Sequence, residues 1–180
     1  MAAPLELTLE GEPVSAPYIE MTKRVKQDME WPVEADWSAG IVWALRASCL
    51  GESICLQGLG RRSSQGDALW SRWGLPLGFS ASYEAQGLVI RGLPSRPKDP
   101  LVLDLKDCPD LAQPIAAAAV LMRRPVKITG LQTLNGKEIP RLDALVGALK
   151  SLGIPSEAPE ARALSFDSSA WNPSEHILEV

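Results

Sequence analysis

A chain of 180 residues with 46% hydrophobic residues is long enough to bury a core, as one domain or as one domain with a further segment. Its net charge of −4 and isoelectric point near 5.1 argue against nucleic-acid binding as the main activity, and its longest apolar run, residues 114–122, is too short to cross a membrane. A single histidine and three cysteines without a CxxC pair argue against a zinc site and a Ser-His-Asp triad, and together with an N-terminus unlike a secretory leader they predict a cytoplasmic protein.

The first half of the chain predicts alternating strands and helices. A strand over residues 5–9 precedes a helix that begins near Pro17 and continues to about Met29. Asp36 is a favoured N-cap residue and predicts a helix over residues 39–50, which Gly51 ends. The segments that follow are a strand over 53–57, a helix over 65–73, and strands over 77–83 and 88–91.

The second half predicts the same kinds of element after a loop rich in proline and charge. Its helix over residues 109–122 is rich in alanine, which indicates that another layer packs closely against it. The other elements are strands over 101–105 and 125–129, a helix over 137–152 that ends at Gly153, and possible strands over 163–166 and 177–180.

The two halves have a common order of elements. In each, an aspartate opens a helix, a strand follows, a glycine-leucine pair ends the strand, and a second helix begins. Asp36 lies 74 residues before Asp110, and Gly58 lies 72 residues before Gly130. An internal repeat of this length predicts an α/β (α+β) fold built from copied units, with mixed sheets around buried helices.

Asp110 at the start of one predicted helix, and Lys137, Glu138 and Arg141 at the start of another, are the candidate functional residues. Helix starts carry unpaired backbone N–H groups and partial positive charge, so with Lys and Arg nearby they favour a phosphate or carboxylate ligand. The residues alone also allow a simpler interpretation, in which Asp110 is an N-cap and the other three are solvated residues of a first helical turn.

Five segments of the chain together resemble the 5-enolpyruvylshikimate-3-phosphate synthase family over residues 5–153. The family fold, as the resemblance implies it, has two similar domains, each made of three β-α-β-α-β-β units, which agrees with the repeat. The matching segments, in the family's order, are VSAPYIEMT (14–22), VEADWS (33–38), GLGRRSSQGD (58–67), PDLA (109–112) and KEIPRL (137–142).

The resemblance implies that the chain is a central piece of such an enzyme. Residues 1–30 would be the end of the last unit of one domain, and residues 31–180 most of the second domain without its C-terminal unit. His176 would lie just before the family's N-D-H-R-M-A motif and is not that motif's histidine. We therefore expect the chain alone to be inactive.

The family reaction joins phosphoenolpyruvate to the 5-hydroxyl of shikimate 3-phosphate and releases phosphate, with no metal or redox cofactor. By resemblance, Asp110 is the general base, and Glu138 transfers a proton to and from the enolpyruvyl carbon. Lys137 contacts both substrates, and Arg141 binds phosphoenolpyruvate with its forked donors.

Two further residues, Ser15 and Tyr18, match family residues that contact shikimate 3-phosphate, although an N-cap serine and a tyrosine at the edge of the core are equally good interpretations of the pattern. The basic, hydroxyl-rich loop of residues 61–64 matches a family segment that is mainly structural, so we leave it out of the site. By resemblance, the whole enzyme is a monomer with small-molecule substrates, and neither nucleic acid nor a membrane is a partner.

The sequence departs from the family pattern at Ala16, where the family has lysine, and at Ile139 and Pro140, where it has threonine and aspartate. Two alternatives therefore stay open. One is the sister transferase that acts on UDP-N-acetylglucosamine, although none of the cysteines has the loop setting that its mechanism uses. The other is a non-catalytic binding module of the same fold.

Overall fold

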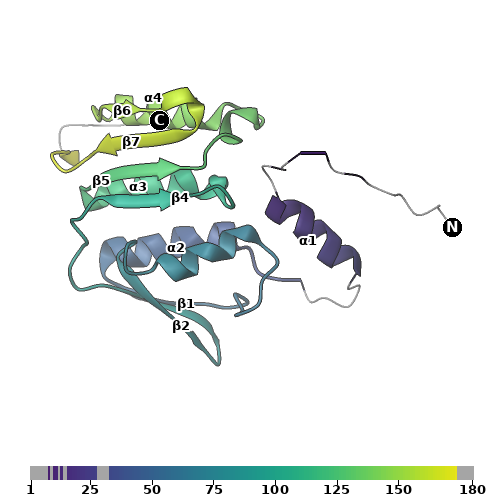
Figure 1. Ribbon diagram of the computed structural model, residues 1–180. Coiled ribbons are helices and arrows are strands. Elements are labelled where there is room, and N and C mark those ends of the chain that lie inside the picture. The colour runs from purple at the N-terminus through teal and green to yellow at the C-terminus, as the bar shows by residue number, and fades with distance from the viewer. Residues whose placement is uncertain (1–7, 9, 12, 14–15, 28–32, 174–180) are drawn as a thin grey trace.

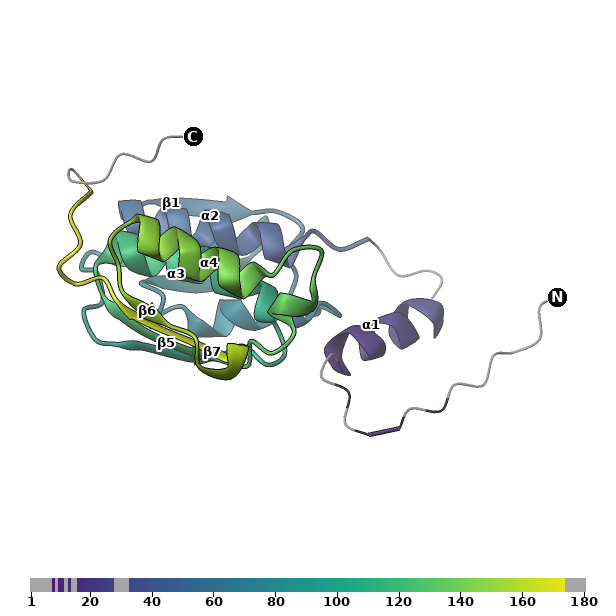
Figure 2. The same cartoon turned by 90° about the horizontal axis from the view of Figure 1, so that it is seen from above.

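Two β-sheets, each covered by helices, make up most of the molecule in the computed structural model, which describes residues 8, 10–11, 13, 16–27 and 33–173 (Figure 1). Helix α2 (Trp37–Leu50) packs on the first sheet and helix α3 (Ala112–Met122) lies against the second, and the two helices pack against each other. Helix α1 (Ala16–Gln27) stands beside this body, at the end where the site described below is found (Figures 1 and 2).

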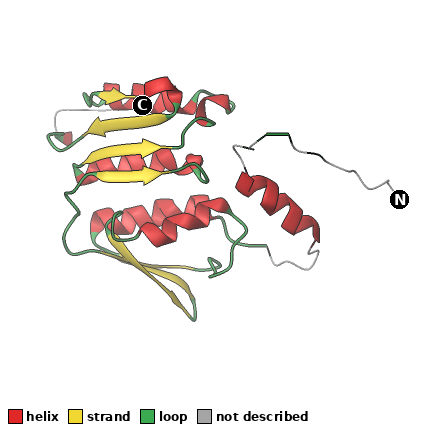
Figure 3. Cartoon of the chain, in the orientation of Figure 1, coloured by secondary structure: helices red, strands yellow, loops and turns green. Residues whose placement is uncertain are grey.

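The second sheet belongs to a complete β-α-β-α-β-β unit. Its strand order is β4-β5-β7-β6, in which β4 and β5 are parallel, and β7 is antiparallel to both β5 and β6. Helix α3 connects β4 to β5, and helix α4 (Arg141–Ser151) connects β5 to β6 (Figure 3). The strands are β4 (Leu101–Asp104), β5 (Pro125–Thr129), β6 (Ser156–Glu157) and β7 (Ala163–Asp167).

The first sheet has the order and directions of a unit without its first strand. Its order is β1-β3-β2, and β3 is antiparallel to both neighbours, so β1, β2 and β3 correspond to β5, β6 and β7. Within the described residues no strand precedes α2 as β4 precedes α3. The repeat expected from the sequence therefore has a counterpart in the topology. The strands are β1 (Ser53–Leu56), β2 (Phe79–Glu84) and β3 (Gly87–Gly92).

The two units turn at equivalent places. Gly58 after β1 and Gly130 after β5 have φ values of 78° and 80°, a left-handed conformation that glycine adopts without steric cost. Gly51 and Arg123 occupy the matching αL positions that end α2 and α3. The spacing seen in the sequence thus reflects copied turns as well as copied strands.

The helix expectations need three corrections. Residues 66–73 form a 3-10 helix, η1 (Gly66–Trp73), a distinction that the apolar pattern does not make. Residues 109–111 also form a 3-10 turn, η2 (Pro109–Leu111), before α3 begins. Helix α4 begins at Arg141 and not at Lys137, because Ile139 precedes a proline and is biased away from helical angles.

Two short 3-10 helices complete the described elements. Some expected elements fall on residues that the structure does not describe. The short elements are η3 (Leu134–Gly136), before α4, and η4 (Pro159–Ala161), before β7. The strands expected over 5–9 and 177–180, and the end of the first helix at Met29, fall on or extend into residues that the structure does not describe.

The core of the first unit contains three aromatic rings. The indole N–H of Trp70 donates to the carbonyl of Trp37 at 2.8 Å, and the two rings meet edge to face at 5.3 Å. Phe79 packs against Trp70 in the same way at 6.0 Å. These contacts join η1, α2 and β2, and so fix the start of η1 next to the start of α2.

Four of the five alanines of α3 are buried, and Ala112, Ala116 and Ala119 are almost without exposure, whereas Ala117 is exposed. Small side chains allow α2 to approach closely. No helix in the described part of the chain combines the length and apolar character that a membrane span requires.

Candidate functional site

Asp110 lies on η2, at the point where the chain turns from β4 into α3. Its side chain caps no helix, so the N-cap interpretation is wrong for this residue. The carboxylate instead accepts hydrogen bonds from two cations: Arg141 Nη1 donates to Oδ1 at 3.0 Å, and Lys137 Nζ donates to Oδ2 at 3.2 Å. The Asp110 side chain is 24% exposed, so these ion pairs are partly screened from water.

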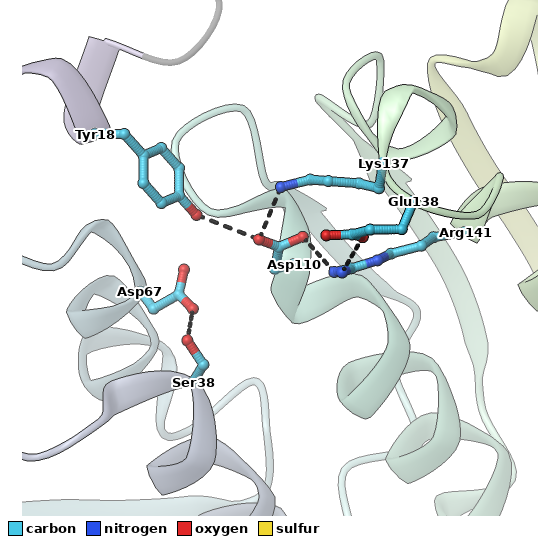
Figure 4. Close-up of polar contacts among 7 residues, drawn as sticks. All are labelled: Tyr18, Ser38, Asp67, Asp110, Lys137, Glu138 and Arg141. Atoms are coloured by element: carbon cyan, nitrogen blue, oxygen red, sulfur yellow. Dashed lines mark hydrogen bonds and ion pairs between the residues drawn. The ribbon is translucent and has the colours of Figure 1, made fainter.

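The segment before α4 brings three charged residues to Asp110. Lys137 and Glu138 lie in the extended stretch between η3 and α4, and Arg141 is the first residue of α4. Arg141 also donates to Glu138 Oε2 at 3.0 Å, so its two nitrogens hold two different carboxylates (Figure 4). The pKa of Glu138 lies below its ordinary value because the carboxylate accepts from its own backbone N–H and from Arg141.

The side chain of Asn135, which lies before α4 in the sequence, caps this helix in place of the residue at the N-cap position. Its Oδ1 accepts from the backbone N–H groups of Leu142 and Asp143 at 3.0 and 3.3 Å. Pro140 stands at the N-cap position and has no N–H to satisfy. Arg141 is therefore free to direct its guanidinium to Asp110 and Glu138.

Tyr18 reaches this group from α1. Its hydroxyl donates to Asp110 Oδ2 at 3.4 Å, a long hydrogen bond, and Lys137 Nζ lies 6.0 Å from the centre of its ring. Burial raises the pKa of Tyr18 above its ordinary value, and the negative charges of Asp67 and Asp110 raise it further. The phenol is therefore a protonated hydrogen-bond donor at neutral pH. We call Tyr18, Asp110, Lys137, Glu138 and Arg141 the Asp110 cluster.

A second carboxyl group, that of Asp67, lies next to the Asp110 cluster. Asp67 is the second residue of η1 and is 5% exposed. Its Oδ2 accepts a hydrogen bond from the hydroxyl of Ser38, while its Oδ1 is buried and has no hydrogen-bond partner. Figure 4 shows the carboxyl between Ser38 and the hydroxyl end of Tyr18. Burial raises the pKa of Asp67, the Ser38 hydrogen bond opposes this, and the charge of Asp110 raises the pKa further.

The loop of residues 61–64 has a structural role. The hydroxyls of Ser63 and Ser64 both donate to Glu34, and the backbone N–H of Ser64 donates to the same carboxylate at 2.8 Å. Gln65 closes the loop, since its Nε2 donates to the carbonyl of Ala35 at 2.9 Å. These hydroxyls donate to Glu34 and are not directed at the Asp110 cluster.

The structure brings together five of the six expected site residues, and the sixth, Ser15, lies outside the described residues. Reasoning from the sequence missed Asp67 and Ser38. Asp67 belongs to a segment that was interpreted as structural, and only the fold places its carboxyl beside Tyr18. Among the described residues, no group of three or more His, Cys, Asp and Glu side chains is arranged to hold a metal ion.

The Asp110 cluster combines two cations, two carboxylates and a phenol within a few ångströms. Lys137 and Arg141 are the donors expected for a phosphate or carboxylate ligand, and Arg141 presents a forked guanidinium. Asp110 is an acceptor that could take a proton from a hydroxyl group once a ligand anion replaces it as partner of the two cations. The arrangement suits the joining of an anion to an alcohol.

Comparisons with known proteins show which family this chain resembles. A sequence model of the family described as EPSP synthase (3-phosphoshikimate 1-carboxyvinyltransferase) matches residues 2–163. Relatives with the name 3-phosphoshikimate 1-carboxyvinyltransferase include that of Bacteroides fragilis, 32% identical over 91% of this chain and 45% of its own length. Those of Idiomarina loihiensis and Methanospirillum hungatei are 30% and 26% identical over 85% and 83% of this chain, and 42% and 41% of their own lengths. The chain thus spans less than half the length of these relatives.

Proposed function

The chain belongs to the EPSP synthase family, and we propose that its Asp110 cluster forms part of a site that transfers the enolpyruvyl group of phosphoenolpyruvate to the 5-hydroxyl of shikimate 3-phosphate, releasing phosphate. The observation that carries the proposal is that Tyr18, from α1, and Lys137 and Arg141, from the segment that opens α4, all bond to the carboxylate of Asp110. The reaction is that of a 3-phosphoshikimate 1-carboxyvinyltransferase, in aromatic amino-acid biosynthesis, and the proposed substrates are small molecules.

Each residue has a role that its position supports. Lys137 and Arg141 bind the two anionic substrates, and their charge stabilises the negative charge that moves during addition and elimination. Asp110 accepts the proton of the attacking 5-hydroxyl, and the exposed carboxylate of Glu138 exchanges a proton with the enolpyruvyl carbon. Tyr18 contacts shikimate 3-phosphate, and the same role for Ser15, which lies outside the described residues, rests on the resemblance alone. The chain's own residues supply this chemistry without a metal or redox group in the proposed mechanism.

We also propose that residues 1–30 end one domain and residues 31–180 form most of the other. The position of α1 beside the two sheets, with Tyr18 extending to Asp110, supports this division (Figure 1). A site between two domains excludes water only when both are present. Because the relatives are about twice as long, we expect the 180-residue chain alone to show no turnover. A cytoplasmic location and a monomeric whole enzyme also stay predictions.

The cysteines give no support to the sister transferase. Cys49 and Cys108 are buried, and Cys55 is exposed on β1, away from the Asp110 cluster. Cys108 precedes Asp110 by two residues, but burial, with the charges of Asp67, Asp107 and Asp104, raises its pKa to about 12. Such a thiol stays protonated and is a poor acid at neutral pH.

A chimera tests the proposal. Residues 16–173 would replace the matching segment of the Bacteroides fragilis relative, and phosphate release would be measured with both substrates. We expect turnover in the chimera and a loss of about 100-fold or more in the Asp110→Asn variant, since general base catalysis contributes at least that much. Asp143→Asn is the control, because Asp143 contacts Asn135 and lies outside the Asp110 cluster.

The test also separates the enzyme from the non-catalytic module. A chimera that folds, binds shikimate 3-phosphate and shows no turnover would support a binding module. A folded chimera whose activity does not change when Asp110 becomes asparagine would contradict the role of Asp110.

A further inference from the structure

The buried Asp67 carboxyl has a free oxygen directed into the site. Ser38 donates to one oxygen, and the other is buried without a partner. Figure 4 shows one oxygen on the side of Ser38 and the other on the side of the Tyr18 hydroxyl. A buried polar atom without a partner is costly, so a site that keeps one has a use for it.

The surroundings of Asp67 favour its uncharged form. The carboxyl is 5% exposed and makes no ion pair in the described residues. The titratable groups around it are the acids Asp36 and Asp110, the base Lys137, the thiol of Cys108 and the phenol of Tyr18. Burial raises the pKa of Asp67 and the charge of Lys137 opposes this rise, but Lys137 is already paired with Asp110, so its charge offsets a second buried negative charge only in part.

We propose that Asp67 is a positioning residue of this site, which keeps its proton at neutral pH and donates it as a hydrogen bond towards the phenol oxygen of Tyr18. The phenol oxygen then accepts from Asp67, and its own hydrogen is directed to Asp110, to which Tyr18 donates in the structure. Ser38 fixes the orientation of the Asp67 carboxyl from the other side. Burial raises the pKa of Asp67, which is the direction that this assignment requires.

The assignment has a functional consequence that rests on the proposed function. A charged Asp67 would repel two anionic substrates and compete with them for Lys137, whereas an uncharged one adds no negative charge to their site. An ionised Asp67 would also accept the phenol hydrogen and turn it away from Asp110. Asp67 thus orients the Tyr18 hydroxyl as a donor for Asp110 or for the substrate that replaces it.

The protonation state of Asp67 is measured directly in the 180-residue chain, without any assumption about activity. Carbon-13 NMR of labelled aspartate carboxyls, recorded between pH 4 and pH 9, reports each carboxyl separately. We expect one carboxyl resonance to keep the shift of the protonated form at pH 7, and to be absent from the spectrum of Asp67→Asn. If the Asp67 resonance shows the ionised form at pH 7, the proposal is wrong, whatever the chain's function.

Variants in the active chimera test the positioning role. Asparagine keeps the size, the neutral charge and an N–H donor, so Asp67→Asn should retain kcat/KM within about two-fold and keep the pH profile. Asp67→Ala removes the donor, and we expect kcat/KM to fall about ten-fold, the equivalent of one lost hydrogen bond, while the Asn variant rescues it.

The control is Asp36→Asn, since Asp36 caps α2 and makes no contact with the Asp110 cluster. Equal losses in the Asn and Ala variants would contradict the proposal, because a charged carboxylate would then be what the site needs. If the chimera shows no activity at all, the proposed function fails, but the NMR measurement still decides the state of Asp67.

Discussion

Asp36 and Asp110 occupy equivalent positions in the two repeated units, but their side chains make different contacts. Both precede the first helix of their unit, and both are aspartates. Asp36 accepts from the N–H groups of Ser38 and Ala39, as an N-cap does, whereas Asp110 accepts from Lys137, Arg141 and Tyr18. The difference follows from the neighbours, because only the second unit places cations opposite the aspartate.

Asp110 lies between Lys137 and Arg141 and pairs with both, so its carboxylate stands where an anion could bind. Removing its charge in Asp110→Asn leaves both cations without that partner, so the affinity of the chain for inorganic phosphate should rise roughly five-fold. Calorimetric or NMR titration with phosphate measures the change. The matched control is Asp143→Asn, which removes a carboxylate from the first turn of α4 without releasing either cation. Unchanged or weaker phosphate binding by Asp110→Asn would show that the two cations are not available to an anion.

The composition of the site could largely be predicted from the sequence, and its geometry could not. The helix-start pattern and the family resemblance identified Asp110, Lys137, Glu138 and Arg141, which the structure places together. Asp67 ends the matched segment 58–67 but was not assigned to the site, because its proposed role depends on burial and on the approach of Tyr18 from a segment about fifty residues away. Burial of a single carboxyl is a property of the packed fold and leaves no periodic pattern.

At the scale of elements, caps and turns set the boundaries more than apolar periodicity does. The cap at Asp36 and the stop at Gly51 were predictable, since both use local chemistry. The start of α4 was misplaced by four residues, because the residue before Pro140 is biased away from helical angles, and the cap from Asn135 carries no signal at the helix start itself. The short strand β6 was missed because two residues carry no pattern of alternation.

The cap of α2 gives a prediction for stability. Asp36→Ala should lower the free energy of unfolding by about 0.5–2 kcal/mol, because two N–H groups of the first turn lose their acceptor. Asp36→Asn should cost little, since asparagine caps about as well as aspartate. Urea unfolding followed by circular dichroism measures both. A loss in the Asn variant as large as in the Ala variant would mean that charge, and not the cap, stabilises this helix start.

Substitution by alanine should have opposite effects on stability at two glycines of the second unit. Gly130 has a φ of 80°, and a Cβ there would lie 2.2 Å from the backbone nitrogen of Lys106, so Gly130→Ala should destabilise the chain by about 2–4 kcal/mol. Gly147 lies inside α4 with nothing within 4 Å of its Cβ position, so Gly147→Ala should stabilise by about 0.5–1 kcal/mol. Thermal unfolding of both variants tests the pair, and a neutral Gly130→Ala would contradict the turn geometry.

At the scale of the whole molecule, Arg124 joins the two units. Its guanidinium, on a residue only 2% exposed, donates to the carbonyl of Pro76 at 2.6 Å and from Nε to the carbonyl of Asp99 at 2.9 Å. Its backbone N–H donates to the hydroxyl of Ser168 after β7. The residue therefore connects the first unit and the linking loop through its side chain, and the second sheet through its backbone.

Truncation of this side chain should weaken the whole structure. Arg124→Ala removes a buried guanidinium that donates to the carbonyls of Pro76 and Asp99, and we expect the free energy of unfolding to fall by about 2–3 kcal/mol. Arg162→Ala is the matched control, because Arg162 is 71% exposed and its distance to Glu160 is 4.0 Å, so its loss should cost little. Urea unfolding of the two variants compares them. Equal effects would show that the contacts of Arg124 do not hold the units together.

The pH dependence of stability reports on Asp67 through the whole molecule. Its pKa in the folded chain is raised above the ordinary value of 3.8, so the folded state binds more protons than the unfolded state in the interval between the two values. The contribution of Asp67 to stability is therefore fully present below pH 3.8 and is lost as the pH rises through the folded pKa.

In Asp67→Asn this loss is absent, whereas other acids with lowered pKa values, such as Glu138 and Asp167, act equally in both proteins. The difference in unfolding free energy, wild type minus Asp67→Asn, should thus fall between about pH 4 and the raised pKa and then level off. Urea unfolding at a series of pH values measures this difference, and a difference that rises with pH would show that the buried carboxyl is stabilised in its charged form.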